Sequence, residues 1–175
     1  MSINMIVAID ESYAIGYKGN LIYRLKKDLK RFRELTSKND YGLKNYILSG
    51  RNTYESLPKE LPDRKMVVLS SNKNYKVNKN IIVEHSLDKV INHYLSGEQE
   101  KDLWIIGGEE IYKQSLDYVD KVYLTFISSK AKKADAYFPF LDMIKKFRIV
   151  DFEADKEDGI DFAYITFERK KSICV

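Results

Sequence analysis

Asp28 is a carboxylate on an otherwise apolar stripe of a predicted helix. Helical geometry places it on the same side as Leu25, Leu29, Phe32 and Leu35. A carboxylate that faces a core is costly unless it has a partner. The free N–H groups of the helix's first turn could be that partner. A ligand with two adjacent N–H donors, such as an aminopyrimidine-type ring, could be the partner instead. The apolar neighbours would also raise the pKa of the carboxyl by desolvation, as is common at functional sites.

Three predicted strands end at residues that could hold phosphate groups. They are Ile105-Ile-Gly-Gly108 before a helix, Leu48-Ser-Gly-Arg-Asn-Thr53, and Val68-Leu-Ser-Ser-Asn-Lys73. Glycines let the backbone approach a ligand, helix starts offer free N–H groups, and Arg51 could grip a phosphate. Each segment also has a purely structural interpretation. Glu109 and Glu110 could complement a helix dipole, Asn52 or Thr53 could cap a helix, and Ser70 with Ser71 could form a turn. Taken together, the three segments predict an extended, phosphate-bearing cofactor, a dinucleotide rather than a single phosphate.

The elements that must position these residues alternate between strands and helices. We predict strands at 3–9, 46–48, 65–69, 81–83, 103–106 and 122–127, helices at 25–35, 87–95 and 109–116, a short helix opening at 50–53, and a final hairpin of 147–152 with 162–167. Residues 10–24 are expected to form a long loop. Alternating βαβ units imply a largely parallel sheet, at whose carboxyl strand ends ligands bind.

Composition excludes several other classes of protein. The chain has 175 residues, 44% hydrophobic and 32% charged, which fits one soluble domain. Its formal net charge is +4, and the basic run 24–33 comes with no nucleic-acid-binding signature. The single cysteine, Cys174, rules out a disulfide within the chain and is expected to be a bystander in the tail. The apolar run 3–9 is too short to span a membrane. His85 and His93 have no acidic or cysteine partner at metal-ligand spacing, so no metal is predicted.

In order and spacing, the chain's motifs resemble those of the dihydrofolate reductase family. The matching set is Ile6-Val-Ala-Ile9, Ile15-Gly16, Leu25-x-x-Asp28-Leu29-x-x-Phe32, Gly50-Arg51-x-Thr53-x-x-Ser56, Leu61-Pro62-x-Arg64, Leu69-Ser70-Ser71, Ile105-Ile-Gly-Gly108 with Ile111-Tyr112, Tyr123-Leu-Thr125, and Phe138-Pro139. The resemblance implies an α/β, single-domain, three-layer fold. Its central mixed, mostly parallel eight-stranded sheet carries a C-terminal antiparallel hairpin and is flanked by about four helices. The domain is expected to span 1–169, with a short tail at 170–175.

The resemblance also implies the substrate site of an enzyme that reduces dihydrofolate to tetrahydrofolate in one-carbon metabolism. Asp28 matches the carboxylate that binds the pterin and promotes protonation of its ring nitrogen, with Thr125 supporting it. Arg64 matches the arginine that clamps the α-carboxylate of the substrate's glutamate. The expected substrate-binding residues are Ile6, Ala8, Asp28, Leu29, Phe32, Leu57, Arg64, Ile106 and Thr125, and the expected catalytic residues are Asp28, Tyr23 and Thr125.

NADPH is the cofactor that the resemblance implies. Arg51 with Ser71 favours a 2′-phosphate, and the peptide between Gly107 and Gly108 is cis in the family. The expected cofactor-binding residues are Ala8, Ile15, Gly16, Asn20, Leu21, Gly50, Arg51, Asn52, Thr53, Leu69, Ser70, Ser71, Ile106, Gly107, Gly108, Glu109, Glu110, Ile111 and Tyr112. Residues 10–24 match the mobile flap over the nicotinamide.

Several positions depart from the family pattern. Ile22-Tyr23 replaces the usual Pro-Trp, so the flap loses a φ restraint. Ser49 replaces a methionine, Ala136 replaces a common threonine, and Glu110 stands where a basic or neutral residue is usual. Asp28 is retained.

Two other functions compete with dihydrofolate reduction. One is a reductase of a related pterin or a riboflavin-pathway pyrimidine, and the other is a non-catalytic structural or RNA-binding use of the fold. The first would not be expected to keep both the Asp28 motif and Arg64, and the second predicts loss of Asp28 or the glycines. We therefore expect a cytoplasmic, monomeric enzyme that binds dihydrofolate and antifolate inhibitors and needs neither nucleic acid nor a membrane.

Overall fold

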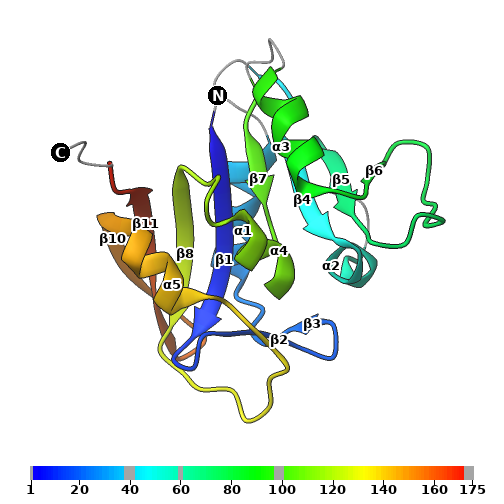
Figure 1. Ribbon diagram of the computed structural model, residues 1–175. Helices are drawn as coiled ribbons and strands as arrows, with labels where there is room; N and C mark the ends of the chain where they lie inside the picture. The colour runs from blue at the N-terminus through cyan, green and yellow to red at the C-terminus, as the bar shows by residue number, and fades with distance from the viewer. Residues whose placement is uncertain (1, 38–41, 59–60, 97–100, 172–175) are drawn as a thin grey trace.

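A computed structural model describes residues 2–37, 42–58, 61–96 and 101–171 (Figure 1). Its described part contains eleven strands and five helices. In chain order they are β1 (Ile3–Asp10), β2 (Ala14–Tyr17), β3 (Asn20–Leu21), α1 (Lys26–Ser37), β4 (Tyr46–Gly50), α2 (Arg51–Ser56), β5 (Lys65–Leu69), β6 (Ile82–Glu84), α3 (Leu87–Ser96), β7 (Leu103–Ile105), α4 (Glu109–Ser115), β8 (Lys121–Ile127), β9 (Ala136–Tyr137), α5 (Phe140–Lys146), β10 (Phe147–Glu157) and β11 (Ile160–Arg169).

The central sheet has eight strands in the order β10-β11-β8-β1-β7-β4-β5-β6. From β8 to β6 every neighbouring pair is parallel, whereas β11 runs against both of its neighbours. The mostly parallel sheet with an antiparallel C-terminal hairpin is therefore confirmed. The parallel strands point their carboxyl ends toward one edge, and that edge is where ligands bind in sheets of this kind.

Alternation along β1 divides the core into two layers. Ile3, Met5, Val7 and Ile9 pack on one face with buried residues of α3, α4 and α5. Ile6 packs on the other face with residues of α1 and α2, including Phe32 and Tyr54. In Figure 1, α3, α4 and α5 lie in front of the sheet and α1 lies behind it. The period-2 pattern of one buried strand thus produces a three-layer fold, as expected.

The stretch 10–24 is more regular than predicted. β2 and β3 form a two-stranded hairpin within it, and β9 adds a third strand on the other side of β2. The hairpin turn is Lys18-Gly19, and both residues have positive φ, at 49° and 75°. Such a turn matches the right-handed twist of the flanking strands. Strands of two to four residues are too short for a periodicity argument, so the sequence alone predicts a loop here.

Helix α5 was also absent from the prediction. It has only seven residues and follows Pro139 directly, which makes five described helices where about four were expected. The final hairpin is longer than predicted, because β10 and β11 pair along 147–157 and 160–169. None of the helices in the described part of the chain combines the length and apolarity needed to cross a membrane.

Candidate active site

Asp28 lies in the first turn of α1 and makes its hydrogen bond to a strand of the sheet beneath, not along its own helix. The hydroxyl of Thr125, in the middle of β8, donates to Asp28 Oδ1 at 2.5 Å. Thr125 is only 1% exposed, so this hydroxyl is a fixed, buried donor. The pairing joins the front of the helix to the strand next to β1 and fixes the orientation of the carboxylate.

The N–H groups at the start of α1 are taken by another carboxylate. Glu157, at the end of β10, accepts hydrogen bonds from the backbone N–H groups of Lys26 and Lys27 at 2.7 and 2.8 Å. The helix is therefore capped by a side chain 130 residues away in the sequence. This finding decides the question that the sequence left open, because Asp28 is not needed as a cap.

The surroundings of Asp28 raise the pKa of its carboxyl. Desolvation by burial is the largest cause. The hydrogen bond from Thr125 and the positive charge of Arg31 act in the opposite direction, and the negative charge of Glu157 adds to the rise. Asp28 is thus a half-buried acid whose ionisation is opposed by desolvation and supported by Thr125 and Arg31.

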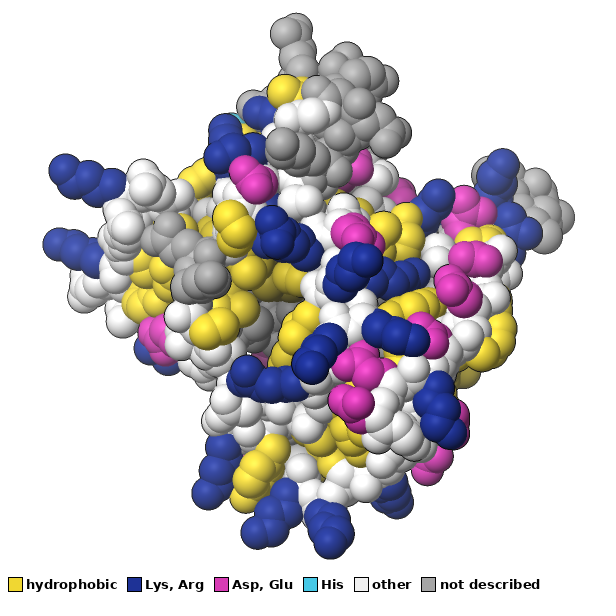
Figure 2. All heavy atoms as spheres, turned by 180° about the vertical axis from the view of Figure 1, so that it is seen from behind, with side chains coloured by type: hydrophobic (Ala, Val, Ile, Leu, Met, Phe, Trp, Pro, Cys, Tyr) yellow, Lys and Arg dark blue, Asp and Glu magenta, His cyan; other side chains and the backbone are white. Residues whose placement is uncertain are grey.

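Apolar side chains form the walls around Asp28. Ile6, Phe32, Leu57 and Ile106 belong to the cluster between the sheet and helices α1 and α2, and Ala8 to the neighbouring cluster under Leu25. Figure 2 views the molecule from the side covered by α1 and shows a hollowed surface with hydrophobic side chains inside and Lys and Arg side chains nearby. The structure thus brings these predicted substrate residues together in space.

Leu29 does not join these clusters, contrary to the predicted core-facing stripe. It is 43% exposed, whereas Leu25 is buried and Phe32 is half-buried. The buried side of α1 is centred on residues 25, 28, 32 and 36, and Leu29 is turned away from that line by about 100° from Asp28. Leu29 therefore lies at the margin of the apolar layer and faces solvent.

Arg64 stands just before β5 and is held by neutral acceptors. Its Nη1 donates to Thr36 Oγ1 at 2.8 Å, and its Nε donates to the carbonyl of Pro62 at 3.0 Å. The guanidinium also lies 5.5 Å from the centre of the Phe32 ring. Burial is the largest cause that lowers the pKa of Arg64, followed by the charge of Arg33, while Asp63 opposes both. A half-buried guanidinium positioned in this way suits the recognition of a carboxylate.

A cleft of about 750 Å³ follows the carboxyl ends of the parallel strands. Every residue predicted to bind the cofactor lines it except Gly107. The three strand ends that the sequence singled out therefore meet in one place. Ala8 and Ile106 line the cleft and also belong to the apolar clusters beside Asp28, so the cleft and the pocket adjoin.

Glycines make room where the strand ends converge. The Gly50 N–H donates to the carbonyl of Gly107 at 2.7 Å. A Cβ on Gly108 would lie 3.0 Å from Thr53 Oγ1, and one on Gly50 would lie 3.1 Å from Ile111 Cγ1. Gly107 has a φ of 112°, which side chains rarely adopt. The peptide between Gly107 and Gly108 is cis, as the resemblance implied.

The structural alternatives for these segments turn out differently from one another. Helix α2 begins after Gly50 and has no side-chain cap, so Asn52 and Thr53 are not caps. Ser70 does form a turn, because its hydroxyl accepts from the Asn72 N–H at 3.2 Å. Glu109 binds Lys113 at 2.6 Å and the Tyr137 N–H at 2.9 Å, which ties α4 to β9. These same contacts lower the pKa of Glu109, with Lys113 the largest cause.

Tyr112 lines the cleft and ties helix α4 to strand β1. Its hydroxyl donates to the Ile6 carbonyl at 2.8 Å, and its ring meets Phe138 edge-on. Burial, and next the charge of Asp28, raise the pKa of this phenol far above its usual value. Tyr112 is therefore a neutral hydrogen-bond donor that fixes β1 at the level of the pocket.

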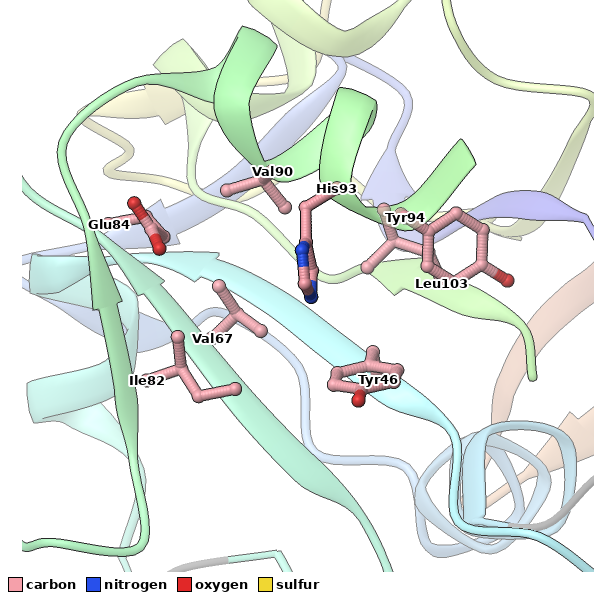
Figure 3. Close-up of a pocket in the computed structure, with 8 residues that line it drawn as sticks. All are labelled: Tyr46, Val67, Ile82, Glu84, Val90, His93, Tyr94 and Leu103. Carbon is pink, nitrogen blue, oxygen red and sulfur yellow. The ribbon is translucent and has the colours of Figure 1, made fainter. Parts of the chain in front are cut away.

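A second, smaller cavity is separate from this cleft. It measures about 110 Å³ and lies under α3, near the amino-terminal ends of the strands (Figure 3). Its lining residues are Tyr46, Val67, Ile82, Glu84, Val90, His93, Tyr94 and Leu103. Figure 3 shows the His93 ring reaching from α3 toward Tyr46 and Val67. Within the described residues, no cluster of three or more His, Cys, Asp or Glu side chains could hold a metal ion.

Comparison with known proteins gives this arrangement a family. Residues 2–169 match the family described as dihydrofolate reductase. The chain belongs to the dihydrofolate reductase family. It is 34% identical to the dihydrofolate reductase of Schistosoma mansoni, over 96% of each chain. It is also 34% identical to that of Buchnera aphidicola subsp. Baizongia pistaciae, over 99% of each. The dihydrofolate reductase of Enterococcus faecalis, solved with NADP(H) and RAB-propyl, superposes with a TM-score of 0.85 at 28% identity and 97% coverage of each chain.

Membership of the dihydrofolate reductase family does not favour the competing functions, whether a related pyrimidine reductase or a non-catalytic protein. Of the three predicted catalytic residues, all of them described in the structure, Tyr23 is the one with no hydrogen bond to the other two. Tyr23 packs partly buried against the cluster of Leu25 and Tyr164, and its hydroxyl makes no hydrogen bond within the part of the chain that the structure describes. The structure therefore does not join Tyr23 to Asp28.

Sequence reasoning missed several residues that shape this dihydrofolate reductase cleft. Val7, Gly19 and Asp135 line it, and Asp135 also accepts from the Lys18 N–H at 2.8 Å. Asp10 is fully buried and accepts four hydrogen bonds, from the N–H and hydroxyl of Ser12 and from the N–H groups of Ala14 and Ala131. An aspartate at the end of an apolar strand was the available signal for that anchor.

Proposed function

We propose that Asp28 is the residue that anchors and helps to protonate the pterin as this chain reduces 7,8-dihydrofolate to tetrahydrofolate with NADPH. One observation carries the assignment: a half-buried carboxylate, oriented by Thr125, adjoins a cleft formed by all three strand-end segments. Thr125 occupies Oδ1, so the other carboxylate oxygen faces no competing hydrogen bond among the described residues. A ring N–H and an exocyclic amine can then donate to the carboxylate as a charge-assisted pair.

The pocket residues orient the ring and exclude water. Ile6, Ala8, Phe32, Leu57 and Ile106 provide apolar walls. Their low polarity strengthens the interaction of Asp28 with a donor and raises the pKa of its carboxyl, which favours proton sharing with a ring nitrogen. Tyr112 keeps the Ile6 carbonyl in place. Holding the ring in one orientation accounts for much of the catalysis in such a site.

The residues of the cleft fit an extended dinucleotide. When bound there, NADPH supplies the hydride that reduces the ring. The absence of a side chain at Gly108, where a Cβ would lie 3.0 Å from Thr53 Oγ1, supports a close approach of the cofactor's pyrophosphate to the backbone. We assign Arg51, Thr53 and Ser71 to the phosphate groups, and Gly107 and Gly108 to the nicotinamide half. The guanidinium carbon of Arg51 lies 5.9 Å from the centre of the Tyr75 ring. Because the side chain is exposed, it has room to turn toward a 2′-phosphate.

The remaining assignments concern the whole molecule. Arg64 is assigned to the glutamate carboxylate of the substrate, and Tyr23 with the stretch 10–24 to a flap over the nicotinamide. Residues 1–169 form the reductase domain and 170–175 a tail, of which 172–175 lie outside the described residues. We further propose a cytoplasmic monomer that antifolates inhibit, since the pocket offers them the same carboxylate as the substrate.

The experiment that tests this function follows nicotinamide absorbance. The protein is mixed with dihydrofolate and either NADPH or NADH. We expect oxidation of NADPH, at a much lower concentration than is needed for NADH. No oxidation of either nucleotide would overturn the function, and equal use of the two would overturn the assignment of the 2′-phosphate.

A further inference from the structure

Arg31 is a cation within the apolar layer that surrounds Asp28. It follows Asp28 by three positions on α1, so the two side chains share one side of the helix. Its guanidinium carbon lies 4.4 Å from the centre of the Tyr164 ring and 5.8 Å from that of Tyr123. Its Nη1 is buried and has no hydrogen-bond partner among the described residues. Aromatic faces therefore hold this charge in place of a carboxylate.

The two aromatic rings that contact Arg31 lie on the same part of the sheet as Thr125, the hydrogen-bond partner of Asp28. Tyr164 on β11 is the register partner of Thr125 on β8. Tyr123 precedes Thr125 by two residues, so both point to the face that α1 covers. The donor that orients Asp28 and the two rings that hold Arg31 are thus fixed to each other by the ladder between β8 and β11.

The other charged groups near Asp28 and Arg31 either bind other groups or are exposed on the surface. Glu157 caps α1, and Asp155 binds Lys27 Nζ at 2.6 Å. Glu153 is exposed on β10 opposite Tyr164, and the phenols of Tyr112, Tyr123 and Tyr164 are neutral because burial raises their pKa values. Of the described charges that act on Asp28, Arg31 is the cation and Glu157 the anion. Arg31 therefore supplies the positive charge that opposes desolvation.

We propose that Arg31 is a positioning residue that keeps the Asp28 carboxylate ionised without binding to it. A direct ion pair would occupy the carboxylate oxygens that a ligand needs. A cation stacked on Tyr164 acts through space and leaves those oxygens available. The proposal rests on the assigned role of Asp28, and it adds a second, charge-based support to the hydrogen bond from Thr125.

The test is a direct titration of Asp28 in the ligand-free protein by ¹³C NMR of its carboxyl carbon. Asp28→Asn identifies the resonance by its disappearance. In Arg31→Gln we expect the midpoint to rise by about one pH unit, the effect of removing one charge a helical turn away in a partly buried site. Arg31→Lys keeps the charge and should leave the midpoint within about a few tenths of a pH unit of the wild-type value.

Lys30→Gln is the matched control, because it removes a charge from the neighbouring position on the exposed side of α1. The Lys30 side chain is 77% exposed, and its Nζ lies 3.7 Å from Glu34 Oε1. An unchanged midpoint in Arg31→Gln, or an equal rise in Arg31→Lys and Arg31→Gln, would overturn the proposal. Should Arg31→Gln fail to fold, the wild-type Arg31 guanidinium resonances should shift with the midpoint of Asp28, and no response would contradict the coupling. Because none of these measurements uses turnover, they stand apart from the activity test.

Discussion

Gly108→Ala is the substitution whose effect on cofactor binding can be worked out most fully. Gly108 has φ −84° and ψ −156°, an extended conformation that alanine adopts without strain. The new Cβ would lie 3.0 Å from Thr53 Oγ1, where ordinary contact begins at 3.4 Å. The Thr53 side chain must therefore give way by a few tenths of an ångström, which takes it off its rotamer minimum. A side chain displaced in this way costs about 0.5–1.5 kcal/mol, which corresponds to roughly two- to tenfold weaker binding of NADPH.

Calorimetric titration of NADPH into four proteins measures this effect as a double-mutant cycle. They are the wild type, Gly108→Ala, Thr53→Ala and the double variant. Thr53→Ala alone should weaken binding, because it removes the hydroxyl assigned to a phosphate. In that background Gly108→Ala should cost little, since the atom it collides with is gone. We expect a coupling of about 1 kcal/mol between the two sites.

Two results would refute this reasoning about the strand-end glycines. One is unchanged NADPH affinity in Gly108→Ala, and the other is full additivity of the two substitutions. Gly159→Ala, in the turn between β10 and β11, is a control for general destabilisation, because Gly159 does not line the cleft and its Cβ would meet no atom within 4 Å although its φ is 82°. It should lower thermal stability without entering the cycle with Thr53.

Three further predictions follow from buried contacts. Thr125→Val removes a charge-assisted hydrogen bond worth about 1.5–3 kcal/mol and should raise the ionisation midpoint of Asp28 by about one to two pH units, while Thr125→Ser should not; an unchanged NMR midpoint would count against the 2.5 Å contact. For Asp10, desolvation raises the pKa, but hydrogen bonds from Ala131, Ser12 and Ala14 outweigh it and leave the pKa lowered. Its contribution to stability is therefore present above the unfolded pKa and lost as pH falls through the folded pKa. Asp10→Asn should lower the free energy of unfolding, measured with urea at pH 7, by about 2–4 kcal/mol. The difference between the variant and the wild type should shrink at acid pH, and a difference of unchanged size there would contradict this account. Arg64→Gln should raise KM for dihydrofolate about 10- to 100-fold with a small change in kcat, and should leave KM unchanged for a dihydropterin that lacks the glutamate tail. Equal effects on both substrates would show that Arg64 acts on the fold instead.

The central strands were predictable because their side chains carry strong periodic or continuous apolar signals. β1 is buried on both faces, β4 ends at Gly50, and Ser70 and Gly107 follow the ends of β5 and β7 within two residues. The meeting of these ends in one cleft follows from the parallel sheet. Asp28 was conspicuous because a carboxylate interrupts an apolar stripe. These features depend on short stretches of sequence and could be inferred from them.

Contacts between distant segments could not be inferred in the same way. Glu157 caps α1 from the other end of the chain, and the sequence gives no sign that β10 ends beside Lys26. In the sequence Arg31 is one cation of a basic run, and only the position of α1 over Tyr123 and Tyr164 shows that its guanidinium is half-buried between aromatic rings. The prediction that Leu29 faces the core is wrong. An apolar pattern shows that a helix has a buried face more reliably than it shows which residues lie at the centre of that face.

The pH dependence of turnover in Asp28→Asn tests the central claim most directly. Initial rates of NADPH oxidation with dihydrofolate are compared for this variant and the wild type between pH 5 and 9. We predict that the variant loses about 10²- to 10⁴-fold in rate at neutral pH, the usual contribution of a positioned proton donor. Its residual rate should rise about tenfold for each unit that the pH falls, since the ring nitrogen must then take its proton from solvent. Equal rates for the two proteins at neutral pH would contradict the role of Asp28.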